Sequence, residues 1–151
     1  MNFSRIIAPV LLATALAGCA TSIVRLPNGA FVHVSNGGSQ ISGTKSVSGA
    51  SGARIKIAFI AAINPDCTTI DGMIVRAVDK PANGTVELVQ NADFPIFTRN
   101  NPRSACNTRR VSGTTVFYRS RSGFTGEDTF SYDWFTPAGI KVHVNVIAHI
   151  E

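Results

Sequence analysis

Beyond residue 53, apolar side chains recur at every second position, the period of a β-strand with one buried face. Ile55, Ile57 and Phe59 begin this pattern, alternating with charged or small residues. The same period predicts further strands over residues 73–77, 85–89, 115–118, 129–134 and 140–148. No window carries a helical stripe of useful length, and turn residues separate the runs. Six or seven short strands in this arrangement predict an all-β chain folded as a β-sandwich.

Aromatic residues mark the most regular of these strands. Phe130, Tyr132 and Trp134 alternate with polar residues, which predicts one buried and one wet face. Trp134 and Phe135 are consecutive, so we expect one to pack inward and the other to face solvent or a partner. Asn83-Gly84 is a turn signal that leads into the strand at 85–89.

The first 18 residues predict a removable signal peptide. Arg5 supplies a positive start, and residues 6–17 form an apolar run that closes with Leu16-Ala17-Gly18-Cys19. A run of 12 apolar residues spans roughly 18 Å as a helix, too short for a bilayer core of about 30 Å. This segment is therefore left out of the fold.

The closing Leu-Ala-Gly-Cys resembles the lipobox of bacterial lipoproteins at all four positions. In that family the cysteine, here Cys19, is joined to diacylglycerol, so the resemblance implies attachment to a membrane through lipid. Ala20 follows where inner-membrane members of the family carry Asp, so the outer membrane of the cell envelope is the expected location. The alternative is an ordinary secretory signal with an incidental cysteine.

Two other cysteines remain, Cys67 and Cys106, an even pair in an oxidising compartment. Neither has a histidine within ten positions, so the pattern does not indicate a metal site. We predict a disulfide between them. By closing a loop, the bond would restrict the unfolded chain and stabilise the fold by roughly 4 kcal/mol. Two free buried thiols are the alternative.

Residues 35–52 hold six Ser, five Gly and one charged residue, a composition typical of a flexible linker. The segment 30–34 before it is either one short strand or an apolar patch within the tether. We therefore expect three parts: a signal peptide over 1–18, a lipidated flexible tether over 19–52, and a sandwich domain over 53–151.

Two stretches resemble bacterial immunoglobulin-like and cadherin-like domains. Residues 80–86 read KPANGTV, and Tyr118 is followed at 123–132 by GFTGEDTFSY, close to the family's Tyr…Gly-Phe-Thr-Gly-x-Asp-x-Phe-x-Tyr signature. The resemblance implies an immunoglobulin-like β-sandwich. Within the second stretch, the glycines permit a tight loop, Asp128 can accept backbone N–H bonds, and the Tyr132 hydroxyl can cap a neighbouring loop.

The chain departs from these families in two places. Residues 134–149 contain no Asp or Glu, whereas members of tandem arrays often bind calcium there, so no calcium or other cofactor is expected. Residues 93–111, which carry Cys106, are an addition to the usual hairpin.

Positive charge is concentrated in one region. The net charge of +5 is too mild to indicate nucleic-acid binding, and an extracytoplasmic address argues against that partner as well. Residues 94–126 nevertheless hold six arginines and no acid, with asparagines interleaved. Guanidinium groups suit carboxylates and phosphates, so the loop could bind an anionic ligand; the alternative is a solvated loop. The candidate ligand-binding residues are Arg99, Arg103, Arg109 and Arg110.

Catalysis and metal binding have little support in the residues. His143 and His149 lie roughly 20 Å apart along one strand, too far to share a metal. The nucleophile-elbow, zinc-helix and phosphate-loop motifs are all missing. We expect a non-catalytic binding or structural module that contacts an envelope protein or polysaccharide. The alternative is an inhibitor lipoprotein that blocks an attacking hydrolase with its arginine-rich loop; a hydrolytic enzyme is a third, less supported class.

Overall fold

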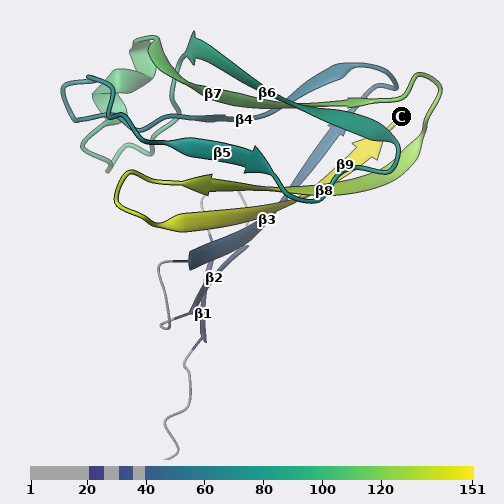
Figure 1. Cartoon of the computed structure of the whole chain (residues 1–151), viewed down its shortest axis with the longest axis horizontal. Coiled ribbons are helices and arrows are strands. Elements are labelled where there is room, and N and C mark those ends of the chain that lie inside the picture. Colours follow the sequence, from purple (N-terminus) through teal and green to yellow (C-terminus); the bar gives the residue numbers. More distant parts are fainter. Residues whose placement is uncertain (1–20, 26–30, 36–39) are drawn as a thin grey trace, which may run out of the picture.

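The computed structural model describes residues 21–25, 31–35 and 40–151. The predicted signal peptide and Cys19 lie outside the described residues. The described residues form strands and one short 3₁₀ helix (Figure 1). The elements are β1 (Thr21–Arg25), β2 (Phe31–Ser35), β3 (Gln40–Gly49), β4 (Arg54–Ile60), β5 (Ile74–Ala77), β6 (Gly84–Asp93), η1 (Ser104–Thr108), β7 (Val111–Ser120), β8 (Gly126–Phe135) and β9 (Lys141–Ile150). In this part of the chain, no helix has the length and apolarity needed to cross a membrane.

Two sheets face each other as the layers of a sandwich (Figure 1). One has the order β1-β2-β3-β9-β8-β5, and the other has the order β4-β7-β6. If β3 is taken as the first strand of the sandwich, its second, fourth and fifth strands (β4, β6 and β7) form one sheet. The third, sixth and seventh strands (β5, β8 and β9) lie in the other. Immunoglobulin domains divide their strands in this way. The prediction of an all-β, immunoglobulin-like sandwich is confirmed.

The predicted flexible tether is wrong over Gln40–Gly49. These residues form β3, which pairs in parallel with β9 over its full ten residues. The ladder uses backbone N–H and C=O groups, which serine and glycine carry like any other residue. Of the two alternatives for residues 30–34, the short strand is the one present: β2 pairs with β3 and extends this sheet. The sandwich therefore begins no later than Gln40, rather than at residue 53.

The core between the sheets follows the predicted alternation, with one shift. In β4 a bulge between Lys56 and Ala58 changes the register, so that Ile60 rather than Phe59 is the next buried residue after Ile57. We call the resulting cluster the main core. Its buried members are Ile57, Ile60, Val116, Tyr118, Phe130, Tyr132, Val146, Ala148 and Ile150.

The two stretches that carry the family resemblance meet at Asp128. Its carboxylate accepts hydrogen bonds from the backbone N–H groups of Ala82 at 3.0 Å and Asn83 at 2.9 Å, and from the Tyr118 hydroxyl at 2.9 Å. The expected backbone bonds to Asp128 are confirmed. The prediction that the Tyr132 hydroxyl caps a neighbouring loop is wrong. The Tyr118 hydroxyl makes the capping bond instead, and the Tyr132 hydroxyl has no hydrogen-bond partner among the described residues.

The Asn83-Gly84 turn leads into β6, as predicted. It lies where the chain crosses from β5 in one sheet to β6 in the other. Gly84 is required for close approach, because a Cβ there would lie 2.5 Å from the Tyr118 ring. Gly123 and Gly126, in the loop before and at the start of β8, have φ values of 80° and 115°, as a tight loop requires.

Candidate functional site

Three connections meet at one end of the sandwich, which we call the loop end: residues 61–73, 94–110 and 136–140 (Figure 1). A disulfide joins Cys67 in the first connection to Cys106 in η1. The predicted pairing is therefore present in the structure. It differs from the disulfide of antibody domains, which joins the two sheets through the core.

A small apolar cluster lies under these loops. Its buried members are Ile63, Cys106 and Val111, and we call it the loop cluster. The Asn107 side chain fastens the long connection by accepting from the Phe97 N–H and donating to the Phe97 carbonyl, each at 2.9 Å. Covalent and side-chain bonds thus order a segment that has little regular secondary structure.

The four candidate arginines divide into two pairs. Arg103 donates through Nε to the Ile63 carbonyl, and Arg110 donates through Nη2 to the Ala92 carbonyl at 2.7 Å. Arg99 and Arg109 are exposed, and within the described part of the chain their side chains make no hydrogen bond or ion pair. The loop end therefore presents two guanidinium groups with all their donors available, while the other two help to fasten the backbone.

The remaining two arginines of the basic region lie elsewhere. Arg119 and Arg121 are at the opposite end of β7, where Arg121 donates to the Asn83 side chain. The six arginines that are close in sequence therefore do not form one patch, because the ten residues of β7 separate them.

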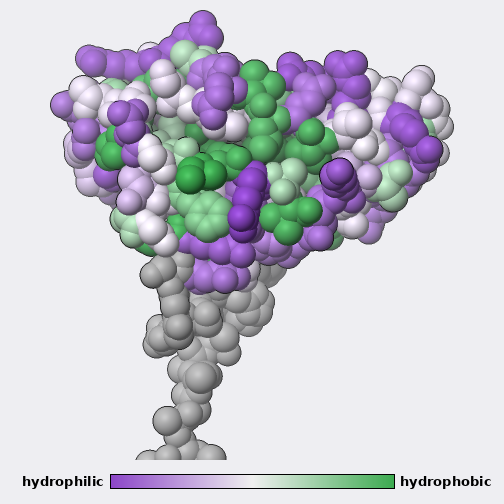
Figure 2. All heavy atoms as spheres, viewed as in Figure 1, coloured by the Kyte–Doolittle hydropathy of each residue, from purple (hydrophilic) through white to green (hydrophobic). Residues whose placement is uncertain are grey.

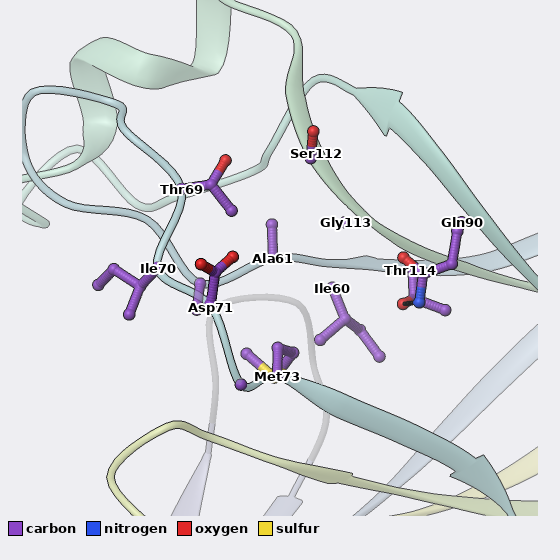
Figure 3. Close-up of a pocket in the computed structure, with 12 residues that line it drawn as sticks. Ile60, Ala61, Thr69, Ile70, Asp71, Met73, Gln90, Ser112, Gly113 and Thr114 are labelled. Carbon is purple, nitrogen blue, oxygen red and sulfur yellow. Dashed lines mark hydrogen bonds between the residues drawn. The ribbon is translucent and has the colours of Figure 1, made fainter.

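A small pocket of about 180 Å³ lies beside the first connection (Figure 3). Asp71 lies on one side of it, and Gln90 and Thr114 lie on the other, joined by a 2.8 Å hydrogen bond. Binding pockets for organic ligands usually measure about 300–1,000 Å³. This pocket is therefore too small for a typical organic ligand.

A buried carboxylate on the outer face of the larger sheet was not anticipated from the sequence. Asp133 is only 1% exposed and lies 2.7 Å from His143 Nδ1, 3.0 Å from the Arg76 guanidinium and 3.3 Å from Lys141 Nζ. Burial raises the pKa of the Asp133 carboxyl, but the hydrogen bonds from these three groups outweigh it and hold the pKa below its ordinary value. Period-two alternation assigned Asp133 to a wet face. Its partners come from neighbouring strands, so only the register reveals them.

The Asp133–His143 pair has the geometry of the orienting half of an acid–base triad. A triad also needs a hydroxyl or thiol bonded to the other ring nitrogen. Ser42 is the register neighbour of His143 on β3, but no such bond exists among the described residues. The same residues contain no group of three side chains able to hold a metal ion. As arranged, the cluster is an ion-pair network that joins β5, β8 and β9.

The consecutive aromatics point to opposite faces, as expected. Trp134 packs against the main core. Phe135 lies on the outer face, where the Arg76 guanidinium is 4.8 Å from its ring centre.

Comparison with known proteins finds no protein-family model, curated protein or solved structure that matches this chain.

Proposed function

We propose that this protein is a lipid-anchored lipoprotein of the cell envelope, at the outer membrane, and that its sandwich is a non-catalytic binding or structural module. Lipid on Cys19 provides the membrane contact. The loop end provides the partner contact, with Arg99 and Arg109 as the charged groups that bind an envelope protein or an anionic polysaccharide.

One observation carries the proposal: the loop end combines a fastened backbone with two available guanidinium groups. The Cys67–Cys106 disulfide and the Asn107 side chain order the long connection before any ligand arrives. Little conformational entropy is then lost on binding. The guanidinium forks of Arg99 and Arg109 suit carboxylate or phosphate groups.

Binding to purified peptidoglycan, which carries peptide carboxylates, tests this contact. Arg99→Ala combined with Arg109→Ala is expected to remove most of the bound fraction, and added salt is expected to weaken wild-type binding. The charge-matched control, Lys80→Ala with Arg119→Ala, removes two exposed cations elsewhere and should bind like wild type. Equal binding by the two double variants would reject the loop end as the contact surface.

The anchor has a separate test. Cys19→Ala is expected to move the protein from the membrane fraction to the soluble fraction and to abolish incorporation of labelled palmitate. Retention in the membrane fraction without label would contradict lipid attachment at this residue, whatever the outcome at the loop end.

The rigid, cationic loop end also fits the second candidate function, an inhibitor of an envelope-attacking hydrolase. A loop that is already ordered can fill an active-site cleft at low entropic cost. Measured inhibition of peptidoglycan hydrolases, lost in the Arg99 and Arg109 double variant, would favour this function over simple polysaccharide binding.

A further inference from the structure

The sandwich is closed along one side and open along the other. On the closed side, β5 contacts β6, and Figure 2 shows apolar and charged side chains filling the surface there. On the other side, a groove of about 730 Å³ lies between β3 and β4, within the size range of organic ligand sites. Its lining includes Lys45, Lys56, Phe59, Phe97, Tyr132 and Trp134.

Most of this lining is apolar, and one residue beside it is unusually exposed. Trp134, Phe59 and Phe97 contribute aromatic surface, and Ile96 is 92% exposed. A large aliphatic side chain this exposed, in a connection fastened by a disulfide, is available for contact with an apolar ligand.

Lys45 places a positive charge inside the groove. Its side chain lies on the inner face of β3, and its ammonium donates to the Ile57 carbonyl. An ammonium has three N–H donors, so two remain for a ligand. The only other lining cation, Lys56, is paired with Asp93 at 2.6 Å, and none of the lining residues is acidic. The groove therefore has an unmatched positive charge.

Tyr132 adds a second polar group from β8, a strand of the same sheet as β3. Its side chain is 3% exposed and lines the groove, yet its hydroxyl has no hydrogen-bond partner among the described residues. No fully buried polar side-chain atom of the described residues lacks a partner, so this hydroxyl has surface open to the groove.

We propose that this groove binds a long-chain fatty acid, with its carboxylate on Lys45 and its hydrocarbon chain along the apolar walls. Charge complementarity selects an anionic head group, and the apolar walls select a hydrocarbon tail. The proposed site uses neither Arg99 nor Arg109. Its test is therefore independent of the function proposed for the loop end.

The single tryptophan of the chain provides the reporter, because Trp134 lines the groove. A fatty acid brominated along its chain is titrated, below its micelle concentration, into the unlipidated protein that begins at Ala20, which contains every described residue. We expect saturable quenching of Trp134 fluorescence. Affinity should rise with chain length by up to about fourfold per added methylene. Absence of quenching would overturn the proposal.

The head group is tested with matched ligands and variants. Wild type should bind the free acid at least about tenfold more tightly than its methyl ester, as expected for a charge-assisted contact. Lys45→Met should remove this preference, whereas Lys80→Met, an exposed lysine outside the groove, should retain it. Equal affinity of wild type for acid and ester would overturn the assignment, even if Lys45→Met failed to fold.

Membrane insertion is the outcome to separate from ligand binding. Vesicles of brominated zwitterionic phospholipid without free acid should leave Trp134 fluorescence unchanged. Quenching by these vesicles to the same extent as by free acid would show an apolar membrane contact and overturn the fatty-acid site.

Discussion

The main core and the loop cluster are both closed to water, but they are held in different ways. Side chains of the main core come from paired strands, so each is positioned by a hydrogen-bonded ladder and by the facing sheet. In the loop cluster, Ile63 and Cys106 lie in connections that have no such ladder. The Cys67–Cys106 disulfide and the Asn107 side chain take its place. Strand pairing thus orders many residues at once, whereas each part of the loop end needs a specific bond of its own.

The largest expected effect lies in the main core. Phe130→Ala removes a buried ring that stacks on Tyr118 at 5.2 Å, and it should lower the free energy of unfolding in urea by about 3–5 kcal/mol. Phe94→Ala, which truncates an exposed ring, should change it by no more than about 0.5 kcal/mol. Similar losses for the two variants would contradict the assignment of Phe130 to the main core.

Removing the disulfide tests how the loop cluster is held. Cys67→Ser with Cys106→Ser should lower the free energy of unfolding by about 2–4 kcal/mol, chiefly because the unfolded chain gains freedom. Hydrogen exchange should quicken first in residues 94–110, while β7, β8 and β9 retain most of their protection. Uniform loss of protection across the sandwich would mean that the two clusters unfold as a single unit.

The two buried tyrosines of the main core offer a matched pair. Tyr118→Phe removes the hydroxyl that donates to the Asp128 carboxylate, and it should cost about 1.5–3 kcal/mol of unfolding free energy. Tyr132→Phe removes a hydroxyl without a partner among the described residues, so the ligand-free protein should lose less than about 0.5 kcal/mol. The reverse order would assign the capping role to Tyr132.

The smallest effect on stability is expected at Asp133, on the outer face of β8, the strand that also carries Phe130. Because the folded-state pKa of Asp133 is lowered, its charge stabilises the fold above pH about 4, and this contribution is lost as pH falls through that pKa. Arg76 and Lys141 are partly exposed, which limits the effect of Asp133→Asn at pH 7 to about 1 kcal/mol.

Urea unfolding at pH 7 and pH 3 measures this dependence. The difference between wild type and Asp133→Asn should shrink at pH 3. A difference for Asp133 that grows toward acid pH would contradict the stabilising ion-pair network.

Local patterns in the chain were sufficient to predict the strands of the main core and the disulfide. Alternating side chains at Phe130, Tyr132 and Trp134 can bury one face only as a strand, and the two cysteines outside the predicted lipoprotein signal can pair with each other in only one way. These features depend on the chemistry of neighbouring residues or on counting, so no knowledge of distant contacts was needed.

Other features depended on which strands became neighbours. Serine and glycine in Gln40–Gly49 predicted a tether, but the parallel ladder with β9 draws on backbone groups that composition does not reveal. Asp133 is buried because strand register brings Arg76 and His143 beside it. The groove containing Lys45 exists because β3 and β4 separate along one side of the sandwich. Periodicity reports which residues share a face, whereas pairing and sheet separation decide what that face meets, and those contacts join residues far apart in the chain.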